Sequence, residues 1–516
     1  MGRKLPALGR GKRAHIQPIK FTNNLIHKPM KNLKKSQLFL IALLAIVVVA
    51  FVVYRVTVRP PAEELAPEAR VAEILDKGGC IDCHSANAEL PFYADMPLVG
   101  KMVTADIEEG YRAFDIEPLA NALKSGETPN PVDVAKVEKV IADGRMPAAK
   151  YYLVHWGSQS TDAKGDIVTD WATTYRTAYY NDGLVGERAG EPVRPIIPPT
   201  DINKAKAELG FALYHDTRLS VDNTVSCASC HGLDTGGVDN HQYSHGVEDR
   251  LGGVNAPTVY NAVYNFVQFW DGRAKTLAEQ AAGPPLNPVE MASTSFDEIV
   301  AKLSADGAYV AKFRALYPGE GISEATITDA IEEFERTLTT PNSRFDKWLL
   351  GDKGAITAEE LKGYELFKEY NCATCHVGPN LGGQSYELMG LRNHYFDARG
   401  MELTEEDNGR YKQTQEERDR HRFKVPGLRN IELTWPYYHD GTRLTMDEAV
   451  RDMALYQCDV ELEAEETEAI VAFLRTLTGE YNGKLLTNPN EYGVIVTHDD
   501  EHDHDHHHDA VAEVEE

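Results

Sequence analysis

Cysteine is scarce in this sequence, and nearly all of it stands in three short motifs. The chain has 7 Cys in 516 residues, and only Cys458 lies outside those motifs. No further Cys or His pairs stand at finger spacing, which argues against structural zinc. A thioredoxin-like redox site needs no adjacent His and does not occur three times. We therefore expect a different use for the motif cysteines, and we expect Cys458 to be a small buried apolar residue.

Acidic residues are absent from the N-terminus. Residues 1–36 contain ten Lys or Arg and no Asp or Glu, although the whole chain has a formal net charge of −27. A basic head joined to an acidic body argues against nucleic-acid binding by the body. Sustained strand alternation is also missing, whereas residues 329–338 and 465–477 show helical spacing of their apolar side chains. This pattern predicts a mainly α fold.

A single apolar run follows the basic head. Leu38 to Tyr54 is uninterrupted, and with Arg55 tolerated near its end the run extends to Val58, which is long enough to span a bilayer as a helix. A cleaved signal peptide is the alternative, but Val58 is followed by Arg-Pro-Pro rather than by a small-x-small cleavage site. We therefore expect a transmembrane helix over 37–58, with residues 1–36 in the cytoplasm and the rest outside the bacterial inner membrane, in the periplasm.

The three motifs are Cys-x-x-Cys-His pentapeptides: Cys80-Cys83-His84, Cys227-Cys230-His231 and Cys372-Cys375-His376. Two cysteines one helical turn apart can form thioethers to the two vinyl groups of a haem, and the adjacent His then supplies a nitrogen to the iron. The sequence therefore predicts three covalently bound haem c groups.

The spacing of the motifs suggests the domain organisation. We expect a mainly α chain in which the transmembrane helix precedes three class I cytochrome c-like haem domains, over 59–185, 200–345 and 346–480. A Pro- and Gly-rich stretch at 186–199 is the predicted boundary between the first two. The acidic, His-rich segment 481–516 is expected to be a disordered tail.

The second axial ligand of the first haem is expected to be Met146. It stands before Pro147 near the end of its domain, where a small monohaem cytochrome c usually has this ligand. Met96, Met102 and His155 are the alternatives, and each is otherwise a packing residue.

Further motifs resemble those of the bacterial dihaem cytochrome c peroxidases. The matching segments are Leu209 to Tyr214, Arg218 to Ser220, Ser226 to His231, Asn255 to Thr258, Phe269 to Arg273, Asn287 to Met291, Thr340 to Asp346 and Tyr437 to Gly441. The resemblance covers residues 203–480. The additional anchored haem domain at the front is similar, in architecture alone, to the three-haem, quinol-oxidising branch of that family.

The resemblance implies a division of labour between the haems. The haem on His231 would be peroxidatic, and the haem on His376 would store an electron with Met453 as its second axial ligand. Trp270 would lie between these two haems. The front haem would refill the store from the membrane side.

The resemblance also implies a catalytic pocket and a calcium site. Glu290 would shuttle a proton, Gln280 would donate or accept hydrogen bonds, and Phe269 would line the pocket. A partly desolvated carboxylate beside a haem has a raised pKa, which suits a shuttle. One calcium ion would be held by Asn255, Thr434 and Pro436, since carbonyl oxygens suit a hard cation.

One position departs from the family pattern. Much of the family blocks the oxidised peroxidatic haem with a distal His, and the matching position here is Val247. Either His245, two residues earlier, takes over as distal ligand, or the site is permanently open. His241 lies a little further back. We favour the open site and predict a high-spin His231 haem in the oxidised protein.

These observations predict a peroxidase that reduces hydrogen peroxide to water. The anchor favours a membrane quinol as electron donor, and the acidic body suits a small basic c-type cytochrome; a homodimer is compatible with the sequence. Two alternatives remain. A multihaem electron conduit would have every iron capped on both faces. A protein-modifying dihaem oxidase would replace the Met of the second haem with Tyr, and Tyr456 lies close to Met453.

Overall fold

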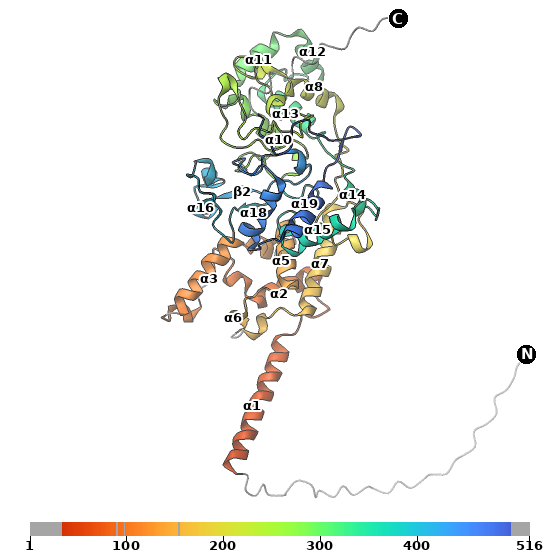
Figure 1. The fold of residues 1–516 in the computed structure, drawn as a ribbon. Coiled ribbons are helices and arrows are strands. Elements are labelled where there is room, and N and C mark those ends of the chain that lie inside the picture. The colour runs from red at the N-terminus through yellow and green to blue at the C-terminus, as the bar shows by residue number, and fades with distance from the viewer. Residues whose placement is uncertain (1–33, 89–90, 98, 153–154, 497–516) are drawn as a thin grey trace, which may run out of the picture. The chain divides into compact units, whose positions relative to one another are not determined.

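The computed structural model describes residues 34–88, 91–97, 99–152 and 155–496. Within these ranges the chain is mainly helical, with long loops and two short two-stranded ribbons (Figure 1). In one ribbon β1 (Tyr386–Leu388) pairs antiparallel with β2 (Arg422–Lys424), and in the other β3 (Glu480–Tyr481) pairs with β4 (Lys484–Leu485). The predicted mainly α class is confirmed.

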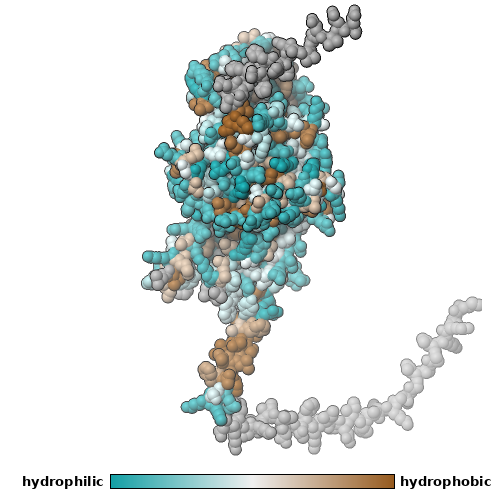
Figure 2. Space-filling view, viewed as in Figure 1, coloured by the Kyte–Doolittle hydropathy of each residue, from teal (hydrophilic) through white to brown (hydrophobic). Residues whose placement is uncertain are grey.

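The first helix, α1 (Lys35–Thr57), belongs to a unit of the chain that ends at Arg59. It has 23 residues and a mean hydropathy of 2.9 over its most apolar part. None of its side chains is buried, and its surface is apolar (Figure 2). By length and composition it can cross a bilayer. Its bounds agree with the predicted span within two residues; residues 1–33 of the predicted cytoplasmic segment lie outside the described residues.

The second unit, which begins at Pro60, contains three main apolar cores; the first and third include residues of their motifs, and a smaller cluster around Tyr214 and Phe334 contacts Cys227 of the second. Helices around the first core are α2 (Pro67–Gly78), α3 (Val99–Ala113), α4 (Glu117–Ser125), α5 (Pro131–Ala142), α6 (Ala149–Tyr152) and α7 (Asp162–Tyr180). The second core region has α8 (Lys204–Tyr214), α9 (Cys227–Cys230), α10 (Leu277–Ala281), α11 (Phe296–Ser304), α12 (Gly307–Leu316) and α13 (Glu324–Glu335). The third has α14 (Arg344–Leu349), α15 (Ala358–Glu369), α16 (Tyr395–Arg399), α17 (Tyr411–Thr414), α18 (Met446–Cys458) and α19 (Ala464–Arg475).

The second and third cores each contain a close helix crossing of the same kind. At Gly210 in α8, an added Cβ would lie 1.9 Å from the carbonyl oxygen of Ala330 in α13. At Gly363 in α15, it would lie 1.8 Å from the carbonyl oxygen of Ala469 in α19. Only glycine permits so close an approach of two backbones. In both cores the glycine-bearing helix precedes the motif in the chain.

The segment 186–199 is fixed rather than a free linker. Val193 pairs with Gly378 in a parallel bridge, and the Arg194 backbone N–H donates to the Gly378 carbonyl over 3.1 Å. The Arg194 guanidinium is fully buried against the Asp182 carboxylate, and the Arg194 carbonyl accepts from Arg429. The predicted boundary therefore packs on the third core, because a buried Arg–Asp pair offsets its lack of regular structure.

Part of the predicted disordered tail is folded. Residues 481–496 were assigned to it, but they include the end of β3, all of β4 and a segment in which the Val494 carbonyl accepts from the Trp435 indole N–H. Leu486 is buried. The acidic, His-rich composition that signals disorder belongs to the residues from His498 onward, which lie outside the described residues. The prediction was thus wrong for 481–496.

Candidate functional site

Each motif histidine is oriented by a backbone carbonyl. Nδ1 of His84 lies 3.1 Å from the Phe114 oxygen, and Nδ1 of His376 lies 2.8 Å from the Leu381 oxygen. Nδ1 of His231 lies 3.3 Å from the Gly237 oxygen. Burial lowers the pKa of all three imidazoles. Each ring is therefore neutral with its proton on Nδ1, which leaves the Nε2 lone pair for a metal.

A cavity of about 750 Å³ links the first and third motifs. Its walls include both cysteines and the histidine of each: Cys80, Cys83, His84, Cys372, Cys375 and His376. Most of the lining surface is apolar. We call this space the main cavity. Paired cysteines, a neutral imidazole and an apolar wall fit covalently held haem at both ends.

Of the four candidates for the first haem's second ligand, Met146 has the best position. It lines the main cavity with His84, and its side chain is still 38% exposed. Met96 and Met102 are half exposed and do not line that cavity. His155 stacks on Tyr151 with ring centroids 4.1 Å apart.

Three methionines line the main cavity on the side of the third motif. Met446 and Met453 stand two turns apart on α18, so they share one face of that helix. Met389 follows β1, and its sulfur accepts a hydrogen bond from Gln457 over 3.6 Å. Met453, the residue that the resemblance singles out, is therefore available to the third haem, although two further sulfurs are nearby.

Cys458, which has no partner cysteine in the sequence, lies close to a cysteine of the third motif in the structure. It ends α18, lines the main cavity and shares a hydrogen bond with Cys372, which lowers the pKa of the Cys458 thiol. It is half-buried. The expected apolar packing role is thus too simple, because the thiol contacts a residue that would carry haem.

Helices of the first core are fixed to the third core beside this cavity. Lys136 on α5 forms an ion pair with Glu387 on β1 at 2.6 Å, and both line the cavity. On the same face Arg418 pairs with Asp115 at 2.9 Å, and the Asn130 side chain donates to the Gln384 carbonyl over 2.9 Å. These contacts hold the first and third motifs in one rigid arrangement.

Trp270 connects the segments around the second and third motifs. Its indole N–H donates to the Asn255 carbonyl over 2.9 Å, and its own carbonyl accepts from the Lys424 backbone N–H over 2.8 Å. The ring lies edge-on to Phe423 and His439, with centroids 6.5 and 6.4 Å away. Trp270 also lines the main cavity. Trp270 is thus fixed between segments of the second and third regions, and its place between two haems stays a prediction.

Glu290 lies beside the second motif. Its carboxylate is close enough to Cys227 to raise the pKa of that thiol. Burial raises the pKa of Glu290 itself, while a hydrogen bond from Asn287 and the charge of Arg273 oppose this shift. Such a carboxyl group holds its proton to higher pH than an exposed one.

Phe269 contacts Arg273, the residue whose charge acts on Glu290, and the backbone of Gln280 lies near Phe269. The Arg273 guanidinium stacks on the Phe269 ring at 3.4 Å from its centroid. A Cβ on Gly283 would lie 3.3 Å from the Gln280 carbonyl and 3.4 Å from the Phe269 ring. Phe269 has a backbone φ of +66°, an uncommon conformation for a bulky residue. These contacts link Phe269 with Arg273, and the catalytic roles of Phe269, Gln280 and Glu290 stay predictions.

The loop at Val247 contains no histidine at the family's distal position. Val247 is 1% exposed in the second core, and its N–H donates to the Glu290 carbonyl over 2.8 Å. His245 forms an ion pair with Asp249, and its ring lies 5.1 Å from that of His241. The loop thus fixes the backbone of Glu290, while the imidazole of His245 is paired with a carboxylate.

Asn255, Thr434 and Pro436 all line the main cavity. The Asn255 amide N–H₂ donates to the His241 carbonyl over 3.0 Å, and this leaves the side-chain oxygen as an acceptor. A calcium ion held by these three residues stays a prediction.

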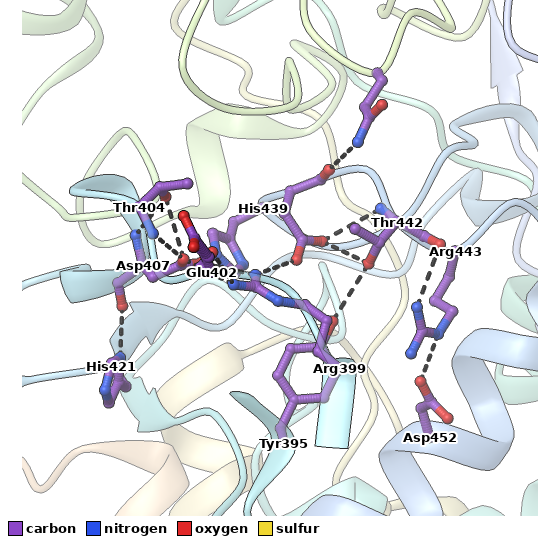
Figure 3. A network of polar contacts seen from close by, with 12 residues as sticks. Tyr395, Arg399, Glu402, Thr404, Asp407, His421, His439, Thr442, Arg443 and Asp452 are labelled. Atoms are coloured by element: carbon purple, nitrogen blue, oxygen red, sulfur yellow. Dashed lines mark hydrogen bonds and ion pairs between the residues drawn. The ribbon is translucent and has the colours of Figure 1, made fainter. Parts of the chain in front are cut away.

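A buried polar network around Arg399 and Asp407 holds His439 (Figure 3), whose ring lies 6.4 Å from that of Trp270. His439 Nε2 lies 2.8 Å from an Asp407 carboxylate oxygen, and Arg399 contacts both Asp407 and Asp440 at 2.8 and 2.6 Å. Asp407, His439 and Asp440 have the spacing of a metal site. Arg399, however, already supplies the countercharge, and the network keeps the pKa of Asp407 well below its usual range. The cluster therefore orients His439.

Sequence reasoning missed this network, Lys424 and a buried acid at Glu335. Glu335 on α13 is 5% exposed and close to Cys227, and burial raises its pKa to about 8. Only the spacing of α13 residues was visible in the sequence. Nothing in that pattern distinguishes a carboxyl group that faces a cofactor site from one that faces solvent.

Neutral, carbonyl-bonded histidines beside paired cysteines define a c-type cytochrome. The description "Di-haem cytochrome c peroxidase" matches residues 204–354, "Haem-binding domain" matches 44–174, and "Cytochrome c" matches 361–478. The chain is 47% identical over 421 residues to Cytochrome c peroxidase Ccp of Escherichia coli, covering 81% of this chain and 90% of that one. It is 48% identical over 293 residues to a cytochrome c551 peroxidase of Nitrosomonas europaea, covering 57% and 85%.

A solved structure of a MauG-like protein associated with microbial copper homeostasis is 28% identical, with a TM-score of 0.50, and the match covers 58% of this chain and 94% of that one. The chain belongs to the di-haem cytochrome c peroxidase family, and it is an enzyme of the peroxidase type that uses haem c.

Proposed function

We propose that this protein reduces hydrogen peroxide to water at the His231 site, with electrons that enter from a membrane quinol or a small c-type cytochrome through the His84 and His376 sites. Two electrons and two protons convert one peroxide into two waters. The half-buried carboxyl group of Glu290, which accepts from the Asn287 side chain while its backbone carbonyl accepts from the Val247 N–H, carries this proposal. When bound, haem supplies the iron chemistry that cleaves the O–O bond.

In this proposal Glu290 takes a proton from one peroxide oxygen and delivers it to the other. Asn287 holds the carboxylate in place through its side-chain N–H₂. Arg273, stacked on Phe269, provides a fixed positive charge that favours the deprotonated form of Glu290. The Gln280 backbone lies close to Phe269, and in this proposal its side chain hydrogen-bonds peroxide. These groups bind and orient peroxide and exclude bulk water.

The shared cavity supports the order of electron transfer. His84 and His376 line one cavity, so electrons can pass from the first site to the third without a further carrier. Trp270 continues the route: Asn255, whose carbonyl it contacts, lies in the loop whose Pro257 carbonyl faces His231. The match to the E. coli protein covers 421 residues, more than the part of this chain that contains the second and third motifs. This supports a three-haem, membrane-anchored arrangement with periplasmic haem domains.

An anaerobic experiment tests the electron donor. The full chain in lipid nanodiscs is reduced with a quinol analogue, peroxide is added, and the haem spectra are followed. We expect the quinol to reduce the haems and one equivalent of peroxide to reoxidise two electron equivalents. A chain that lacks residues 1–59 should lose quinol reduction but keep peroxide turnover with a reduced small cytochrome. If the shortened chain accepts quinol electrons equally fast, anchored entry is wrong.

The open distal face gives a second prediction. Because Val247 replaces the family's distal His and His245 is paired with Asp249, we expect a high-spin ferric signal from one haem in the fully oxidised protein. Cyanide should bind that haem without prior reduction. Electron paramagnetic resonance and a cyanide titration check this. Purely low-spin signals with no cyanide binding would contradict the open site. They would favour an electron conduit or His245 as the distal ligand. In that case a Val247→His variant should behave like the wild type.

A protein-modifying oxidase is the less favoured function. The chain is 33% identical over 288 residues to the methylamine utilization protein MauG of Methylorubrum extorquens. The Tyr456 side chain, however, packs on Tyr395 with ring centroids 5.4 Å apart and does not line the main cavity, whereas Met453 does. A Tyr ligand at the third site therefore has no support from this side chain.

A further inference from the structure

Lys424 is a buried cation on the wall of the main cavity. It is the last residue of β2, lies opposite Tyr386 of β1, and is 5% exposed. Its backbone N–H donates to the Trp270 carbonyl over 2.8 Å. The side chain lines the cavity. A lysine is rarely buried unless its ammonium group is paired.

No protein partner for this ammonium group is found within the part of the chain that the structure describes. No hydrogen bond or ion pair involves Nζ, and burial alone lowers the pKa of Lys424 to about 8. Lys136 makes the contrast clear, because it lines the same cavity with Glu387 at 2.6 Å. An unpaired buried ammonium group is costly unless a bound group supplies the anion.

The position of Lys424 indicates which bound group that is. Val425 and Pro426 follow it directly and also line the cavity, and the Pro426 carbonyl faces the His376 imidazole. The strand thus leads from the Trp270 junction to the third motif. A haem held at Cys372 and Cys375 would carry two propionate carboxylates, and these are the anions that it would supply to this cavity.

We propose that the ammonium group of Lys424 binds a propionate of the haem attached to the third motif, at the junction with Trp270, and thereby favours the reduced form of that haem. This rests on the proposed haem site at His376, but not on peroxide chemistry. A fixed positive charge stabilises the reduced state, which has one positive charge fewer at the iron. Lys424 is thus a positioning residue for the electron store.

A redox titration of the full chain in detergent, without peroxide or quinol, tests this. In Lys424→Gln, the ratio of reduced to oxidised third haem at a fixed potential should fall about tenfold, which is about 59 mV for one electron. Lys424→Arg keeps the charge and should stay within about twofold of the wild type. The control is Lys347→Gln, an exposed lysine paired with Glu480, which should titrate like the wild type.

A second measurement covers the case in which Lys424→Gln does not assemble. In resonance Raman spectra, the propionate bending mode should shift in Lys424→Arg, because an ammonium donor becomes a guanidinium donor. Wild-type potentials in Lys424→Gln, or an unshifted mode in Lys424→Arg, would overturn the assignment. A haem count that lacks the third haem would instead contradict the proposed function, so the two failures are distinguishable.

Discussion

Glu290→Gln is expected to lower kcat for peroxide reduction by about 100- to 10,000-fold, the usual contribution of a positioned acid–base group. The amide keeps the shape of the side chain and can still contact Asn287, but it cannot take a proton from peroxide. Haem content and the haem potentials should stay at their wild-type values, because the carboxyl group is not an expected ligand. Stopped-flow turnover of the reduced enzyme measures the effect.

Glu320→Gln is the matched control. Glu320 is an exposed glutamate in the same region of the chain, and its loss should leave kcat unchanged. Equal rates for Glu290→Gln and the wild type would remove Glu290 from the mechanism. Glu335, the buried acid near Cys227, would then be the next candidate.

The pH profile provides an independent check on the same role. As a base, Glu290 must be deprotonated, so activity should rise with pH through its pKa. Burial raises that pKa, so the acid limb of kcat/KM should lie above the ordinary glutamate value of about 4.3. Asn287→Ala removes a hydrogen bond that favours the carboxylate, so the limb should move to higher pH. Glu290→Gln should lack this limb.

The fold was predictable where one residue type dictates the chemistry. Three Cys-x-x-Cys-His motifs and one apolar run fixed the helical class and the order of the elements. The segment 186–199 was not predictable, because its Pro and Gly content resembles a linker. What holds it is the burial of Arg194 against Asp182, a contact that depends on tertiary packing.

The candidate site divides in the same way. Glu290, Phe269 and Trp270 could be predicted as site residues because the segments that contain them resemble those of a known family. Lys424 could not, since a lysine in a short strand gives no sign that it is buried. Its position depends on the pairing of β1 with β2 and on the contact with Trp270. The network around Arg399 also assembles from segments that are far apart in the sequence.

Met453→Leu is expected to lower the midpoint potential of the third haem by at least about 120 mV, a hundredfold change in the one-electron equilibrium. A thioether opposite His favours reduced iron, and axial ligands control potentials over about 0.8 V. Without this ligand the store no longer holds its electron, so peroxide turnover should collapse even though Glu290 is intact. A redox titration and the loss of the near-infrared sulfur-to-iron band measure the change.

Two other methionines provide matched control variants for Met453→Leu. Met389 and Met446 line the same cavity as Met453, so Met389→Leu and Met446→Leu change the same number of atoms on the same walls. Both should retain the near-infrared band and a potential close to that of the wild type. Should Met389→Leu lose the band while Met453→Leu keeps it, the ligand comes from the end of β1, where Gln457 now donates to its sulfur. The electron store would then be built on the segment that also carries Glu387, so its potential would depend directly on the ion pair with Lys136.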